Sequence, residues 1–132
     1  MFLKKDTFTY NEASTTLYEL SGLQRVEYLE FIQKRTAEYD QAAESMPDTD
    51  KRVAYMQMGV EINAWLVSRS LFNGDTTQDV DALCQSLQGQ WSYEALGQAA
   101  DNILDLSGMS VTEEKDTDGT ASQSETSSPE KS

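Results

Sequence analysis

The residues that could perform chemistry in this chain are carboxylates and one thiol, because the sequence contains no histidine. Without imidazole, the commonest general base and the commonest transition-metal ligand are both missing. Cys84 lies among apolar residues at helical spacing, which favours a small core residue over a nucleophile. A single cysteine forms neither an internal disulfide nor a cysteine-rich zinc site. We therefore expect no catalytic residue, no cofactor and no metal ion.

The carboxylates have the spacing of a solvated acidic face. Glu27, Glu30 and Glu38 could approach one another on a helix, but no nucleophile or base accompanies them. The segments DTDKR and DTDGT contain D-x-D, and neither is followed by the glycine and glutamate of a calcium loop. Phosphate-binding and nucleophile-elbow motifs are missing as well. The sequence thus favours a binding protein over an enzyme.

The charge of the chain limits what it binds. The 132 residues include 23 acidic and 10 basic side chains, a formal net charge of −13. Such a surface repels nucleic-acid phosphates and anionic membranes. No apolar run approaches the ~20 residues of a membrane-spanning helix, and the first residues lack the apolar region of a secretory signal. We expect no nucleic acid and no membrane among the partners, which should be basic, neutral or apolar.

The apolar pattern predicts a mainly α fold, a small bundle of three to four helices preceded by a short N-terminal β-hairpin. Residues 2–10 alternate as a strand, residues 11–14 form a turn, and residues 15–20 pair back. A first helix follows Ser21, whose spacing to Gln24 is that of a capping box, and runs to about Glu44. The proline within residues 46–50 ends this helix.

Three further helices are predicted at about residues 50–72, 80–89 and 93–106. A glycine marks the end of each helix, at Gly74, Gly89 and Gly108. With the hairpin, they make one helical domain over residues 1–109. Residues 110–132 contain almost no apolar side chain and cannot bury enough surface to offset the entropy of ordering. We expect a disordered acidic tail or linker there.

The second predicted helix has two apolar strips. One has the spacing of a core face and contains Val53, Met56, Val60, Ala64, Val67 and Leu71. The other lies about a third of a turn away and contains Met58, Ile62, Trp65 and Phe72. Leaving Trp65 and Phe72 in water would forgo roughly 7–12 kcal/mol, at ~25 cal/mol per Å² of apolar surface. Both strips must therefore be covered.

Two interpretations remain open for the second strip. It could be the second side of a central core helix, or it could dock a partner while the first strip forms the core. The first helix also has apolar residues all round its circumference, so it too must be surrounded. For the docking interpretation we expect seven contact residues: Tyr28, Phe31, Ile32, Met58, Ile62, Trp65 and Phe72. Self-association would also complete the coverage.

Several segments resemble a known family in their order along the chain. They are the opening MFLK, the segment L-x-E-L-S-G-L-Q-R-V-E-Y-L at residues 17–29, AWLVSRSLFN at residues 64–73, a later tryptophan followed by a helix, and LSGM at residues 106–109. Together they resemble the minor tail protein G family, the tail assembly chaperones of lambda-like long-tailed bacteriophages. The resemblance spans about residues 1–109.

The resemblance implies a function that periodicity does not reveal. Members of this family coat the long, helical tape measure protein until tail tube subunits polymerise around it, in the host cell cytoplasm, and are absent from the mature virion. A ribosomal frameshift typically adds a C-terminal domain that recruits the tail tube protein. Such proteins are mainly helical and often self-associate. An A-rich slippery nucleotide sequence that encodes Glu130 and Lys131 would suit such a frameshift.

A different class of function is also compatible with the charge. An acidic protein can mimic DNA and inhibit a host nucleic-acid-binding protein, provided its carboxylates lie at phosphate-like spacing on a folded surface. Much of the acidic charge here instead falls in the predicted tail, at Glu113, Glu114, Asp116, Asp118, Glu125 and Glu130. A salt-sensitive complex with a host DNA-binding protein would favour the mimic, and soluble co-purification with the tape measure protein would favour the chaperone.

Overall fold

The computed structural model describes residues 2–110 of the chain. Within them, strands β1 (Lys5–Tyr10) and β2 (Ala13–Tyr18) precede helices α1 (Gly22–Ala43), α2 (Asp48–Gly74), α3 (Val80–Gln90) and α4 (Tyr93–Leu106). The predicted mainly α fold with an N-terminal β-hairpin is confirmed. The division into a domain and a tail stays a prediction, because residues 111–132 lie outside the described part of the chain.

The β-hairpin has a tighter turn than predicted. β1 pairs antiparallel with β2, and Phe8 lies opposite Thr15. Only Asn11 and Glu12 form the turn, with φ angles of 49° and 69°. Positive φ at both central residues is the type I′ geometry, which matches the twist of the two strands and lets pairing begin at once. The predicted turn over residues 11–14 is therefore wrong, because Ala13 and Ser14 belong to β2.

The helix ends follow the capping signals. Ser21 Oγ accepts a hydrogen bond from the Gln24 backbone N–H at 3.1 Å, and Gln24 Oε1 accepts one from the Ser21 N–H at 2.9 Å. This reciprocal pair confirms the predicted capping box. Asp79 caps α3, and Ser92 caps α4. The break between α1 and α2 falls around Pro47, which is the N-cap residue of α2.

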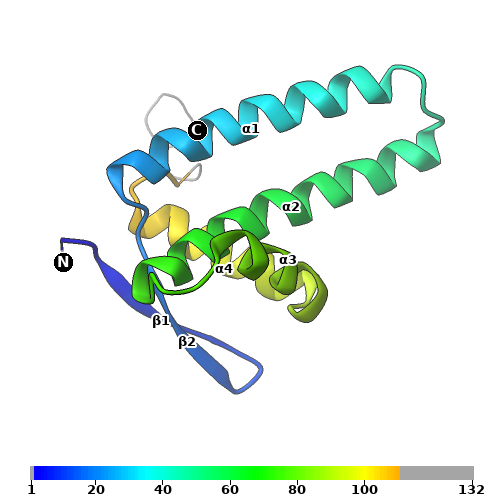
Figure 1. The fold of residues 1–132 in the computed structure, drawn as a ribbon. Coiled ribbons are helices and arrows are strands. Elements are labelled where there is room, and N and C mark those ends of the chain that lie inside the picture. The colour runs from blue at the N-terminus through cyan, green and yellow to red at the C-terminus, as the bar shows by residue number, and fades with distance from the viewer. Residues whose placement is uncertain (1, 111–132) are drawn as a thin grey trace, which may run out of the picture.

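Helix α2 is the central element of the fold. In Figure 1, α1 runs antiparallel along one side of α2, while α3 and α4 lie on the opposite side and the hairpin packs against α2 and α4. The fully buried side chains Leu17, Leu66, Leu96 and Ile103 come from β2, α2 and α4 and join these elements into one core. The core therefore lies around the C-terminal half of α2.

Buried polar groups fix the connection from β2 to α1 against the helices. The Ser70 hydroxyl accepts from the Tyr18 N–H at 2.6 Å and donates to the Tyr18 carbonyl at 2.8 Å. Asn73 Nδ2 donates to the Glu19 carbonyl at 3.1 Å. The Ser107 hydroxyl accepts from the Leu20 N–H at 3.0 Å. These bonds satisfy backbone groups at the strand–helix junction and set the direction in which α1 starts.

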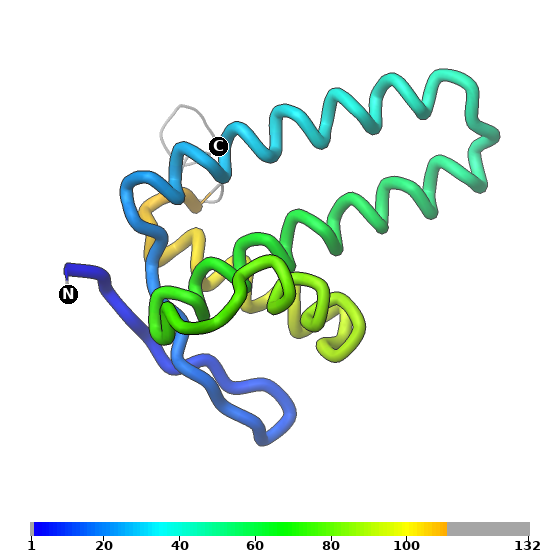
Figure 2. Tube along the Cα trace, in the orientation of Figure 1, coloured from blue at the N-terminus to red at the C-terminus, as the bar shows by residue number. Residues whose placement is uncertain are grey.

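The predicted core face of α2 is only partly buried. Ala64 and Val67 are fully buried, but Val53 and Met56 are 68% and 50% exposed. Figure 2 gives the reason: the ends of α1 and α2 that meet near residues 44–47 extend beyond α3, α4 and the hairpin. The prediction that Val53 and Met56 are core residues is therefore wrong, because no described element covers that end of α2 on this side.

Candidate partner-binding surfaces

The α1–α2 seam, the contact between α1 and α2, contains the residues predicted to bind a partner. Trp65 on α2 stacks against Phe31 on α1, with ring centroids 5.6 Å apart, and lies 5.8 Å from the Tyr28 ring. The Arg69 guanidinium lies 4.3 Å from the centroid of the Trp65 ring, a cation–π distance. Trp65 is 8% exposed, so this aromatic cluster fills the seam rather than facing solvent.

The other predicted contact residues are covered to different degrees. Met58 is 7% exposed, while Phe31, Ile32, Ile62 and Phe72 are half-buried. A half-buried ion pair between Arg35 and Glu61, at 2.7 Å, joins the two helices nearby. Burial also raises the pKa of the Tyr28 phenol, so this side chain stays neutral well above neutral pH. The structure brings these seven residues to one side of α2, and partner binding by them stays a prediction.

A second apolar surface lies on the outer side of α1. We call it the α1 stripe: Leu23, Val26 and Leu29, which are spaced three residues apart and are each more than half exposed. Neighbouring positions along the same helix carry Glu27 and Glu30. The α1 stripe is therefore an apolar strip with acidic side chains beside it.

The third surface is a groove between α2 and the α3–α4 junction, and we call it the α2–α4 groove. Its hollow encloses about 370 Å³ and is lined by Val53, Met56, Gln57, Val60, Gln88, Trp91, Tyr93 and Leu96. Leu96 is buried at its base, whereas Val53, Met56 and Tyr93 are at least half exposed. The lining is thus mainly apolar and open to solvent on a helix face that was predicted to be core.

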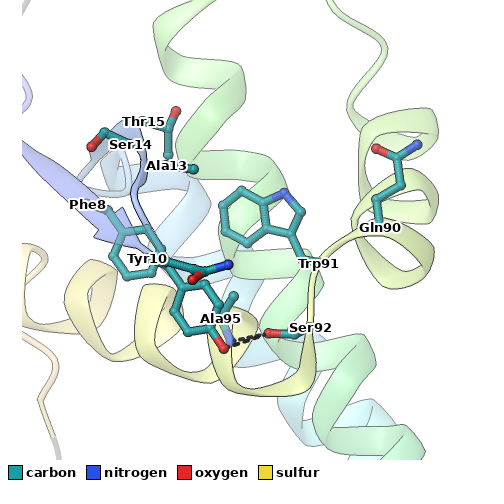
Figure 3. A pocket seen from close by; sticks show the side chains of 10 residues that line it. Phe8, Tyr10, Ala13, Ser14, Thr15, Gln90, Trp91, Ser92 and Ala95 are labelled. Atoms are coloured by element: carbon teal, nitrogen blue, oxygen red, sulfur yellow. Dashed lines mark hydrogen bonds between the residues drawn. The ribbon is translucent and has the colours of Figure 1, made fainter.

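Trp91 also lines a neighbouring hollow of about 380 Å³ beside the hairpin. Figure 3 shows the Trp91 and Phe8 rings facing this hollow, with Tyr10, Ser92 and Ala95 below them. The Phe8 and Trp91 rings stack at 6.2 Å, and the Ser92 hydroxyl donates to Tyr10 Oη at 3.3 Å. The packing on Phe8 holds Trp91 in place between the two hollows.

Sequence reasoning missed Trp91 as part of a surface, although a signal was present. Trp91 directly precedes the N-cap Ser92, and Leu96 is the fourth residue of α4. Apolar residues at these two positions form a hydrophobic staple, which fixes the angle at which a chain enters a helix. Both staple residues line the α2–α4 groove. The staple therefore shapes one wall of the groove.

The described residues contain little that would support other chemistry. Between residues 2 and 110, no group of three or more Cys, Asp or Glu side chains is arranged to hold a metal ion. Over the same range, the helices are too short or too polar to span a membrane. Cys84 is half-buried against the core.

Exposed apolar grooves and stripes on a small helical domain are typical of a protein that binds other proteins. The chain belongs to the bacteriophage lambda tail assembly chaperone family, TAC, protein G, whose family model matches residues 1–127. This family is not a class of enzyme. The resemblance seen in the sequence is thereby confirmed, and the chain has a role in phage tail assembly.

Two relatives are tail assembly proteins G. That of Escherichia phage lambda is 29% identical in an alignment of 117 residues, covering 83% of this chain and 79% of the lambda protein. That of Escherichia phage N15 is 29% identical over 118 residues, covering 83% of this chain and 78% of the relative. The same share of this chain matches tail assembly protein GT of Escherichia phage lambda, but only 39% of that longer protein. No solved structure matches the chain.

Proposed function

We propose that this chain is a tail assembly chaperone that binds and solubilises the tape measure protein before the tail tube forms around it. Membership of the protein G family supports a role in tail assembly. The observation that carries the proposal is the apolar surface left outside the core, at the α1 stripe and the α2–α4 groove. Apolar helix surfaces of this kind can cover apolar stretches of a long helical protein.

The charge suits this role. A complex that covers apolar protein stays in solution only if its outer surface is polar and carries net charge. The net charge of −13 supplies that property, since coated complexes repel one another. We infer that the protein acts in the host cell cytoplasm and is absent from the mature virion, where the tube replaces it.

The proposal also includes a second, longer protein made from the same gene. The match to tail assembly protein GT covers only part of that relative, so a G-like region can be one portion of a larger chain. We infer that frameshifting near Glu130 and Lys131 adds a domain that recruits tail tube protein. The gene's nucleotide sequence tests this step: a slippery heptamer followed by an overlapping reading frame is expected, and its lack would remove the longer product.

Co-expression with the tape measure protein of the same phage tests the central function. We expect the tape measure protein to be largely insoluble alone and to co-purify with this chain in the soluble fraction when both are present. Tape measure protein that stays insoluble and does not co-purify would contradict the proposal. A salt-sensitive complex with a host DNA-binding protein, formed instead, would favour the DNA-mimic alternative.

A further inference from the structure

The α2–α4 groove has the shape of a helix-binding site. Val53, Met56, Gln57 and Val60 are spaced i, i+3, i+4 and i+7, so they form one face of two turns of α2, about 10 Å long. Trp91 and Tyr93 form the opposite wall, and Leu96 is buried at the base. Two walls with an apolar base between them are the geometry in which an amphipathic helix buries its apolar face.

The charge around the groove indicates which helix it accepts. Residues 70–109, which include α3 and α4, contain six carboxylates and no Lys or Arg. On the α2 wall, Lys51 and Arg52 offset Asp48 and Asp50. One of these carboxylates, Asp81 on α3, lies 3.7 Å from the Arg69 guanidinium of α2. The remaining five leave the α3–α4 side with net negative charge, which attracts a helix whose apolar stripe is flanked by basic side chains.

The same charge disfavours a second copy of this chain as the occupant. One exposed helical strip that a second copy could offer is the α1 stripe, which lies beside Glu27 and Glu30. Docking it would bring these carboxylates toward the acidic α3–α4 side, in a chain of net charge −13. A partner with basic residues avoids this repulsion.

We propose that the α2–α4 groove binds one amphipathic helix of the tape measure protein, with Lys or Arg side chains flanking its apolar stripe. This inference rests on the proposed function and assigns it to one surface. The α1 stripe is then not required for tape measure binding. Met56, half exposed at the middle of the α2 wall, is the central contact.

A matched pair of charge substitutions tests the groove. Met56→Glu places a carboxylate in the groove, and Val26→Glu places one on the α1 stripe at a site of equal exposure, 52% against 50%. Both sites are open to solvent, so thermal unfolding should show a similar stability for both variants. We expect Met56→Glu to weaken binding of tagged tape measure protein by about tenfold or more, as a central apolar contact does, and Val26→Glu to leave it unchanged.

The other outcomes are distinguishable. If the wild-type chain binds no tape measure protein, the proposed function fails and the groove assignment fails with it. If the wild type binds and Met56→Glu binds equally well, or if both variants lose binding alike, only the groove assignment is overturned. A change in the oligomeric mass of Met56→Glu in sedimentation, with tape measure binding kept, would show the groove to be a self-association surface instead.

Salt tests the chemistry of the bound helix. Attraction between basic side chains of the bound helix and the carboxylates of α3 and α4 weakens as the salt concentration rises, because exposed charges are screened. We expect the affinity of the wild-type complex to fall as sodium chloride is added. An affinity that stays constant or rises with salt would overturn the assignment of a basic helix.

Discussion

Met56 and Met58 lie two residues apart on α2 and have opposite environments. Met56 is half exposed in the α2–α4 groove, whereas Met58 is 7% exposed and lies two helical turns before Trp65, on the same face of α2. Two residues correspond to about 200° around a helix, so the two side chains point in nearly opposite directions. The sequence placed both methionines on apolar strips, but it could not show which strip would be covered.

Trp65 is buried in the α1–α2 seam. Its ring packs on Phe31 and Tyr28, so truncation to alanine would leave a cavity between α1 and α2. We expect Trp65→Ala to lower the free energy of unfolding by about 3–5 kcal/mol, a large part of the ~5–15 kcal/mol of a typical domain. Urea denaturation measures this loss, and Leu29→Ala at the exposed α1 stripe serves as a control with a change within about 0.5 kcal/mol.

A different result for Trp65→Ala would favour the docking interpretation of the seam. If the variant keeps the wild-type stability and loses tape measure binding, then Trp65 contacts the partner rather than holding α1 on α2.

At the scale of elements, much of the architecture could be predicted, because helix ends depend on local signals. The capping box at Ser21 and the N-cap at Ser92 located α1 and α4, and the structure gives α4 the predicted bounds Tyr93–Leu106. Coverage of a helix face could not be predicted in this way. Periodicity tells which residues share a face, whereas burial depends on which other elements cover that face. Here an open groove separates α3 and α4 from Val53, which is 68% exposed.

The backbone of the hairpin turn is strained at Glu12, and this strain can be tested. Glu12 adopts a φ of 69°, a left-handed conformation that costs a residue with a Cβ atom about 1 kcal/mol or more and costs glycine little. Asn-Gly is the preferred pair for this type I′ turn, and Asn11 already occupies its first position. We expect Glu12→Gly to raise the free energy of unfolding by roughly 1 kcal/mol, measured by chemical denaturation.

Glu12→Ala is the matched control for the turn, because it removes the carboxylate and keeps the Cβ atom. We expect it to have nearly the wild-type stability. A Glu12→Gly variant less stable than Glu12→Ala would show that the left-handed geometry is not what limits this turn.

At the scale of the whole molecule, the apolar surface and the charge act together. The core is concentrated around the C-terminal half of α2, which leaves the outer half of the α1–α2 pair and the groove beside it accessible. The acidic surface keeps such an apolar groove in solution and selects partners of opposite charge. Sequence reasoning reached the family and the need for an apolar contact surface. For the docking interpretation it named seven residues that lie on one side of α2, because aromatic residues and methionines suit a helix-in-groove contact. The other interpretation, a central core helix, stayed open.

Hydroxyl-radical footprinting of the two neighbouring methionines tests most directly where a partner binds. Exposed methionines are oxidised and buried ones are protected, so Met56 and Met58 report on the groove and on the seam within one peptide. In the free chain we expect oxidation of Met56 but not of Met58, and in the complex with tape measure protein we expect both to be protected. Met56 that stays oxidised in the complex, or Met58 that is oxidised in the free chain and protected by the partner, would contradict the assignment of binding to the α2–α4 groove.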